Sequence, residues 1–248
     1  MQKILSFIRQ AVQSYNMIED GDVIAVGVSG GKDSLVLLKA LHSLMSFYPK
    51  QFNIKAVTVD AGFPGTDFKA VKEMCRELDI EYIIEKTDIK EIVFDRKKEK
   101  SPCSLCSKMR RAALCNSAKN AGCNKIALGH NCDDAIETFI MNIIYNGKAM
   151  CFEPVTVYED IGITIIRPLI YAREYMISKC AKEYNLPLIN KICPADGNTM
   201  REKTKKLISG IKLENKNASK NIFTAIKSLP EFKKYEVTDK RGNDEQSH

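Results

Sequence analysis

Short apolar runs alternate along the chain with segments whose apolar residues recur every three or four positions. The runs are rich in Val and Ile and predict buried strands at residues 23–28, 54–60, 80–85 and 125–128, with a hairpin over 155–166. The segments between and after them predict helices over residues 66–78, 107–120, 173–184, 199–213 and 217–229. This alternation predicts an α/β fold on a parallel, Rossmann-like sheet, with a small helical extension at the C-terminal end.

The same pattern divides the chain. We expect an N-terminal helix over residues 1–20, the main domain over 21–195, further helices over 196–230 and a mobile polar tail over 231–248. Lys3 and Arg9 interrupt the first apolar segment, so an amphipathic helix is expected there and not a signal peptide. No apolar run reaches membrane-spanning length, which favours a cytoplasmic protein without a membrane partner. A chain of 248 residues, 44% of them apolar, is long enough for one large core.

The first strand ends in a glycine turn that leads into a helix. Two adjacent glycines let a ligand approach the backbone, and the free N–H groups of the helix start point into the turn. Such a turn is typical of a phosphate site. The expected phosphate-binding residues are Val28, Ser29, Gly30, Gly31, Lys32, Asp33 and Ser34.

Two common phosphate loops do not match this turn. A Walker A loop requires Gly where the chain has Val26 and Ser or Thr where it has Asp33, and the dinucleotide fingerprint requires Gly in place of Ser29. The sequence SGGKDS instead resembles the PP-loop of the ATP pyrophosphatases, enzymes that split ATP between the α- and β-phosphates. In those enzymes the loop binds the released pyrophosphate.

Polar residues follow two further strands, and ligands of parallel sheets lie beyond such strand ends. The backbone at Val59 and Asp60 is expected to hold the adenine of ATP; the alternative is that Asp60 only caps its turn. The fourth strand opens into GHNCDD ahead of another helix, and Gly129 and His130 are expected at the nucleotide. His130 either contacts substrate or anchors the loop.

Two adjacent carboxylates, Asp133 and Asp134, begin the helix after this loop. One Asp is enough to cap a helix, which leaves the other for Mg²⁺ or for substrate. Which of the two is the cap is left open, so Asp133 and Asp134 are both predicted as catalytic residues.

The cysteines favour metal or redox chemistry. The chain has nine, an odd number for a disulfide framework, and Cys103 and Cys106 precede a predicted helix in a Cys-x-x-Cys spacing. The helix dipole and the basic residues behind them are expected to lower both thiol pKa values and favour a soft metal. Cys193, beside a proline and ahead of a basic block, is the natural third partner. A zinc nucleobase deaminase is excluded because His42, the only upstream histidine, is not followed by x-Glu.

The net charge of +7 is concentrated in three basic blocks, at residues 96–100, 108–111 and 201–206. A single block is often only a solvated surface, but three blocks, two of them beside candidate site cysteines, favour a nucleic-acid substrate.

In order and spacing, SGGKDS, PCSLCSKMRR, ALGHNCDDAIET, IRPLIYARE and the late Cys193 resemble the tRNA 2-thiocytidine synthetases (the TtcA family) of PP-loop enzymes. The resemblance spans roughly residues 22–207. It implies that SGGKDS binds ATP and that Cys103, Cys106 and Cys193 hold a 4Fe-4S cluster with one iron left open. By similarity to the related tRNA 2-thiouridine synthetases, Arg110 takes the place of a basic catalytic residue and Asp134 that of a catalytic carboxylate.

Two departures bear on this resemblance. The family often has another cysteine three residues after the third ligand, where this chain has Asp196, and the flanking zinc-ribbon cysteines of the thiouridine enzymes are missing. The second departure argues against the thiouridine branch.

The implied reaction uses ATP and Mg²⁺ to adenylylate a pyrimidine C2 oxygen, which sulfur then replaces. The partners considered are tRNA, a sulfur donor (a cysteine desulfurase or sulfide) and a second copy of the chain. Two alternatives stay open at this point: another PP-loop tRNA-modifying ligase, of the thiouridine or lysidine type, and a zinc-binding, non-catalytic nucleotide-binding module.

Overall fold

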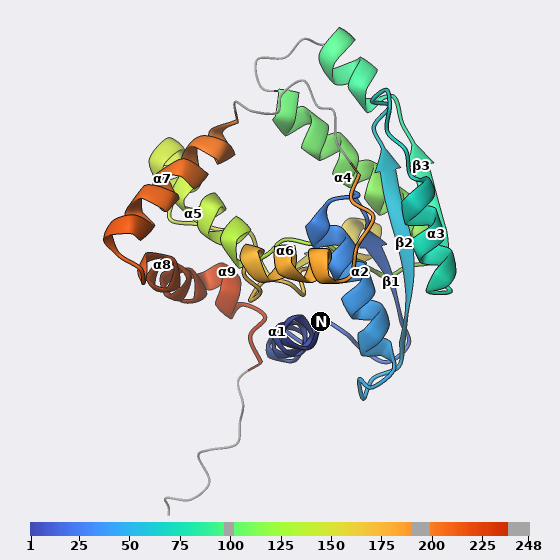
Figure 1. Cartoon of the computed structure of the whole chain (residues 1–248), viewed down its shortest axis with the longest axis horizontal. Coiled ribbons are helices and arrows are strands. Elements are labelled where there is room, and N and C mark those ends of the chain that lie inside the picture. Colours follow the sequence, from blue (N-terminus) through green and yellow to red (C-terminus); the bar gives the residue numbers. More distant parts are fainter. Residues whose placement is uncertain (97–101, 190–198, 238–248) are drawn as a thin grey trace, which may run out of the picture.

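A six-stranded sheet forms the centre of the molecule (Figure 1). The computed structural model describes residues 1–96, 102–189 and 199–237. The strands are β1 (Asp22–Gly27), β2 (Phe52–Asp60), β3 (Tyr82–Lys86), β4 (Lys125–Ala127), β5 (Val155–Tyr158) and β6 (Ile163–Ile166). They lie in the order β3-β2-β1-β4-β6-β5, and all neighbours are parallel except the edge pair β5 and β6.

The order of the strands reverses beside β1, which has β2 on one side and β4 on the other. The chain first runs outward from β1 to β3 and then crosses back to β4. At such a reversal, neighbouring connections leave on opposite faces of the sheet and open a crevice beyond the carboxyl ends of the strands. The loops after β1 and β4 therefore share that crevice.

Helices cover both faces of the sheet. The larger core contains buried residues of α1 (Gln2–Ser14), α2 (Lys32–Met45), α3 (Lys69–Glu77) and α6 (Glu174–Glu183), together with Ile24 and Val26 of β1. Ala25, between those two, points to the opposite face, where a second core includes Cys115 and Ala118 of α4 (Pro102–Asn120). The alternation along β1 is that of a strand buried on both faces.

A helical lobe lies beside the sheet (Figure 1). It consists of α5 (Cys132–Asn146), α7 (Met200–Glu214), α8 (Ala218–Lys227) and α9 (Pro230–Lys233). Ile208, Ile226 and Phe232 of this lobe are buried in the larger core, so the lobe and the sheet share one apolar interior. No helix in the described ranges is both long and apolar enough to span a bilayer.

The predicted α/β class and the order of its elements are confirmed, but several boundaries are wrong. The N-terminal helix ends at Ser14 because Asn16 adopts a left-handed φ of 44°, which lets Met17 and Ile18 turn into the core. The helix predicted from residue 107 begins at Pro102, where proline suits a first turn. Residues 91–96 form a short π-helix.

The polar tail predicted from residue 231 does not begin there. Phe232 is only 1% exposed, and the Val237 N–H donates to the Ser14 carbonyl at 2.8 Å. The sequence shows two aromatic residues, Phe232 and Tyr235, in a polar segment, and burial of Phe232 depends on distant helices. Residues 238–248 lie outside the described part of the chain.

Candidate active site

The glycine turn after β1 is held open by its own side chains. The Ser34 hydroxyl accepts from the Ser29 N–H at 3.1 Å and donates to the Gly31 carbonyl at 2.9 Å. At the strand end, the Val28 N–H donates to the Val57 carbonyl and the Thr58 hydroxyl donates to the Val28 carbonyl at 2.7 Å. The turn thus has a fixed backbone before any ligand binds.

Two glycines are required by close packing. Gly30 has a φ of +75°, and a Cβ there would lie 2.6 Å from the side chain of Ile189. The backbone N–H of Ile189 donates to the Gly30 carbonyl, which holds the two segments together. A Cβ on Gly129 would lie 3.0 Å from the backbone of Asp33. Only glycine lets the loops after β1 and β4 approach this closely.

Ion pairs orient Lys32 and Asp33 at the start of α2. Lys32 Nζ lies 3.1 Å from Asp33 Oδ2 and 3.0 Å from Glu174 Oε1 at the start of α6. Partial burial disfavours the charge on Lys32, but the two carboxylates outweigh burial and raise its pKa. Lys32 therefore stays cationic beside the turn. Asp33 also accepts a hydrogen bond from the Asn131 side chain at 3.0 Å.

Asn131, and neither aspartate, caps helix α5. Its side-chain oxygen accepts from the N–H groups of Asp133 and Asp134, while Asp134 accepts from the Asn131 N–H in a capping box. The expectation that one of the two aspartates is the cap was wrong. The Asn-x-x-Asp spacing within GHNCDD could have indicated this motif.

Asp133 is held by α6. Arg173 makes a bidentate pair with its carboxylate at 3.0 and 2.8 Å, and the Glu174 N–H donates to it at 2.7 Å. These bonds fix the start of α6 against the start of α5, which is a positioning contact. The catalytic role predicted for Asp133 stays a prediction.

Asp134 faces a second carboxylate that the sequence did not single out. Burial raises the pKa of Asp134, against the opposing effect of the Asn131 N–H. Glu137, one turn further along α5, is 6% exposed, and burial raises its pKa to about 7. Arg201 of α7 lies 3.5 Å from Asp134 and 3.6 Å from Glu137. A guanidinium thus balances two partly desolvated acids.

The first turns of α4 carry the cysteine pair. Cys103 is exposed and Cys106 is partly buried, one helical turn apart. Leu105, Cys106 and Met109 pack against a small buried core of Ala61, Ile89 and Val93, which fixes this end of α4 beside the loop after β2. Both thiols are therefore presented from one rigid helix.

The third predicted ligand, Cys193, lies outside the described residues. Within the described ranges, no group of three His, Cys, Asp or Glu residues is placed to hold a metal ion. Two thiols separated by one turn of α4 fit part of a cluster site, since helical residues three apart lie on one face. The ligand set stays a prediction.

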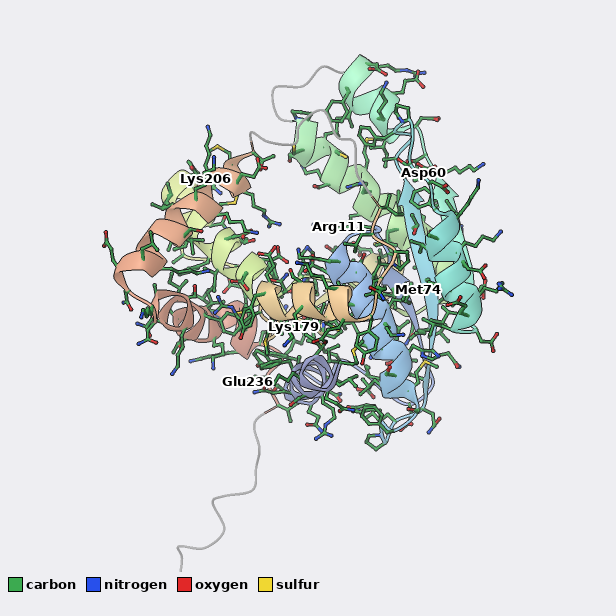
Figure 2. All side chains as sticks on the ribbon, in the orientation of Figure 1. Asp60, Met74, Arg111, Lys179, Lys206 and Glu236 are labelled. Carbon is green, nitrogen blue, oxygen red and sulfur yellow. The ribbon has the colours of Figure 1, made fainter. Side chains whose placement is uncertain are left out.

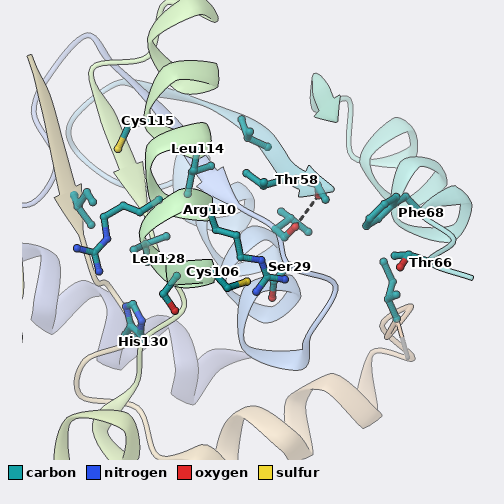
Figure 3. A pocket seen from close by; sticks show the side chains of 18 of the residues that line it. Ser29, Thr58, Thr66, Phe68, Cys106, Arg110, Leu114, Cys115, Leu128 and His130 are labelled. Atoms are coloured by element: carbon teal, nitrogen blue, oxygen red, sulfur yellow. Dashed lines mark hydrogen bonds between the residues drawn. The ribbon is translucent and has the colours of Figure 1, made fainter. Parts of the chain in front are cut away.

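A cavity of about 500 Å³ connects these elements. Its wall combines the end of β1 and the first residues of the glycine turn, Val28 and Ser29, with the end of β2 and one face of α4; residues 30–34 of the turn are not among the described lining residues. Figure 3 shows the side chains of Ser29, Cys106 and Arg110 gathered at its middle. The volume is in the range of small-molecule sites, and Arg110 and Arg111 give the wall positive charge.

The end of β2 contributes to the same cavity. Val59 lines it, whereas the Asp60 carboxylate accepts from the Gly62 N–H at 3.0 Å within its own turn. Thr58, Phe63, Thr66 and Phe68 line it as well and were not predicted. Their contribution depends on the path of the loop after β2, which no local pattern specifies.

His130 also lines the cavity, with its ring 5.1 Å from that of Phe152. Burial, aided by the charges of Arg167, Arg201 and Arg111, lowers the pKa of His130 to about 3. The imidazole is therefore neutral at physiological pH.

Comparison with known proteins identifies the family. The sequence model of the PP-loop domain family matches residues 3–205 of this chain. The tRNA-cytidine(32) 2-sulfurtransferase of Geobacter sulfurreducens is 35% identical over 228 residues, which cover 91% of this chain and 89% of that protein. The chain belongs to the PP-loop family of tRNA-cytidine(32) 2-sulfurtransferases.

A second relative agrees with this family, and a solved structure agrees with the fold. The tRNA-cytidine(32) 2-sulfurtransferase of Cupriavidus metallidurans is 35% identical over 229 residues, which cover 92% of this chain and 73% of that protein. The solved structure of the U34-tRNA thiolase NcsA from Methanococcus maripaludis with its 4Fe-4S cluster superposes with a TM-score of 0.76, covering 91% of this chain and 77% of NcsA at 23% identity. This likeness confirms the PP-loop fold predicted from SGGKDS.

Proposed function

We propose that this PP-loop protein is an ATP-dependent tRNA sulfurtransferase that replaces the C2 oxygen of a cytidine with sulfur. The observation that carries the proposal is the cavity that Ser29 of the glycine turn lines together with Cys106 and Arg110 of α4. An ATP-cleaving loop and a thiol-bearing helix are thereby brought to the same small volume. The names of the curated relatives give the cytidine at position 32 of tRNA as the preferred target.

The glycine turn is the proposed site for the ATP phosphates. Free N–H groups at the start of α2 and the cationic Lys32 favour the negative charge that develops on departing pyrophosphate. Val59 and the backbone around it are proposed to face the adenine, because Val59 lines the cavity at the end of β2. We place the α-phosphate between these two parts of the cavity, toward Arg110 and Cys106, which also line it.

Arg110 and Asp134 are the proposed catalytic pair. Arg110 lines the cavity and would stabilise charge on the transferred adenylyl group. Asp134 forms the capping box of α5 with Asn131, which also donates to Asp33, and the second oxygen of Asp134 lies 3.5 Å from Arg201. Carboxylates beside phosphate oxygens are suitable Mg²⁺ ligands, so we propose Mg²⁺ at Asp134. Asp133 forms an ion pair with Arg173, so we assign Asp133 the role of holding the first turn of α5 in position.

Cys103, Cys106 and Cys193 are the proposed ligands of a 4Fe-4S cluster, which when bound supplies an iron site for the incoming sulfur. The exposure of Cys103 and the packed position of Cys106 suit a group that lies between solvent and the cavity. The sulfur donor, a second copy of the chain and a cytoplasmic location stay predictions.

Positive side chains along α7 are proposed to bind the tRNA backbone. Lys203, Lys205 and Lys206 are exposed on this helix, and Figure 2 shows Lys206 on the outer lobe. A single-stranded tRNA loop could then present its base to the cavity, as sequence-specific RNA recognition generally requires.

Mass spectrometry of tRNA nucleosides tests the proposal. Anaerobically purified protein with ATP, Mg²⁺, sulfide and unmodified tRNA should form 2-thiocytidine, whereas Asp33→Ala should abolish both 2-thiocytidine formation and pyrophosphate release while remaining folded. Asp160→Ala, at an exposed site on the short helix between β5 and β6, is the matched control. A colourless, zinc-loaded protein that forms no thionucleoside would contradict the proposal.

A further inference from the structure

One end of the cavity has no role in the function proposed above. Figure 3 shows Leu114, Leu128 and His130 on one side of Ser29 and Cys106, with Thr66 and Phe68 on the other. We call the first side the inner end; Ile165 and Arg111 also line the cavity. A Cβ on Gly27 would lie 3.1 Å from Leu128 and 3.2 Å from Leu114, so these two leucines meet at the end of β1. The inner end is apolar on that side.

The inner end also carries an unsatisfied polar atom. Within the described residues, Nδ1 of His130 is buried and has no hydrogen-bond partner. A buried polar group without a partner costs free energy, which a ligand that pairs with it would recover. The His130 ring packs on the ring of Phe152, and the Arg167 guanidinium lies 5.2 Å from the centroid of that Phe152 ring. These contacts hold the imidazole in place. His130 is thus a fixed polar group at an apolar wall.

The charges around this ring exclude a cationic ligand. Burial and the positive charges of Arg167, Arg201 and Arg111 lower the pKa of His130 and keep its imidazole neutral. Among the described residues, the lining of the cavity includes Arg110 and Arg111 but no carboxylate. A neutral, planar ligand with hydrogen-bonding edges fits this wall. An anionic group attached to that ligand would be favoured by the charges of Arg110 and Arg111.

We propose that the inner end holds the pyrimidine base to be modified, turned out of a single-stranded RNA loop, and that Nδ1 of His130 hydrogen-bonds its polar edge. The inference rests on the proposed function. With adenine at the end of β2 and phosphates at the glycine turn, a base at the inner end directs its C2 oxygen to the middle of the cavity, where Arg110 and Cys106 lie. Neutral imidazole can donate or accept, which suits either edge of a pyrimidine.

Binding of two matched RNA hairpins tests this inference. Both carry a seven-nucleotide loop and differ only at the position equivalent to nucleotide 32, which is cytosine in one and abasic in the other. The protein with its metal complement should bind the cytosine hairpin about tenfold more tightly, a typical contribution of one recognised base. In His130→Ala this ratio should fall to near one. His42→Ala, at the opposite end of α2 from the glycine turn, should keep it.

Leu114→Trp provides a second variant that fills the inner end without altering His130. It should also abolish the preference for the cytosine hairpin over the abasic one. If His130→Ala does not fold, this ratio in Leu114→Trp tests the inference by itself. An unchanged ratio in Leu114→Trp, or in a folded His130→Ala, would overturn the inference. So would a His130→Ala protein that loses ATP affinity but keeps the ratio, since His130 would then belong to the nucleotide site. A parental protein that prefers cytosine but thiolates no RNA would support the base site and refute the proposed function.

Discussion

The side-chain amide of Asn131 donates a 3.0 Å hydrogen bond to Asp33 Oδ1, joining residues 98 positions apart. The oxygen of the same amide accepts from the N–H groups of Asp133 and Asp134 at 2.9 and 3.1 Å. One side chain therefore caps α5 and orients the carboxylate of the glycine turn. The two loops that flank the reversal in strand order are coupled through Asn131.

Substituting Asn131 separates these two tasks. Asn131→Asp keeps a capping oxygen but loses the donor and places a like charge beside Asp33, so pyrophosphate release should fall at least tenfold with little loss of stability. Asn131→Ala should lose the cap as well and lower the free energy of unfolding by about 1 kcal/mol. Pyrophosphate release and urea unfolding, measured on both variants, check this. Equal activity in Asn131→Asp and the parent would show that Asp33 needs no orientation.

Loss of individual cysteines should divide them into two groups. Replacing Cys103, Cys106 or Cys193 by Ala should remove iron and sulfur transfer together, because two thiolates do not hold the cluster against solvent. Cys123→Ala and Cys132→Ala remove buried thiols and should cost only modest stability with iron retained. Iron content, visible absorbance and ATP binding should be measured on all five. Full iron in Cys193→Ala with loss in Cys132→Ala would make Cys132 the third ligand.

The lysines of α7 should differ in their effect on ATP. Lys203→Glu and Lys206→Glu should weaken RNA binding and lower the salt slope by about one each, without changing ATP affinity. Lys205 Nζ lies 2.6 Å from Glu174 Oε2, and Glu174 also pairs with Lys32. Lys205→Glu adds a carboxylate that competes with ATP for Lys32, so it should weaken ATP binding as well. RNA and ATP titrations at several salt concentrations check both expectations, and RNA binding that does not respond to salt would argue for a small-molecule substrate.

Protonation of Glu137 should make part of the stability pH-dependent. Burial, aided by the charge of Asp134 and opposed by that of Arg201, raises its pKa from 4.5 to about 7 in the folded protein. Between these values the folded state keeps a proton that the unfolded chain loses, so the contribution of Glu137 to stability falls as pH rises. Relative to the parent, Glu137→Gln should gain on the order of 3 kcal/mol from pH 4.5 to above pH 7.

Urea unfolding at pH 4.5 and pH 8 measures this difference. Comparison with the parent removes the contribution of other titrating groups, such as His130. Glu214→Gln, at the exposed end of α7, is the matched control and should show no such trend. A pH-independent difference for Glu137→Gln would mean that Arg201 keeps the carboxylate ionised.

The sequence by itself was sufficient for the type and order of most elements and for the glycine turn after β1. Val- and Ile-rich runs form strands because both faces of a parallel sheet are buried, and SGGKDS forms the turn because Gly30 adopts a φ that other residues avoid. These properties depend on neighbours in the chain. The family resemblance followed from such local motifs and their order.

Tertiary structure decided which of those residues meet and which polar groups become unusual. Glu137 is an ordinary helical residue in the sequence, yet the packing of α5 against α7 buries it beside Asp134 and brings Arg201 to it. The burial of Phe232 and the hydrogen bond from Asn131 to Asp33 likewise depend on the packing of elements that are far apart in the chain. Burial and electrostatic coupling are set by distances between such elements, and no local pattern of residues encodes those distances.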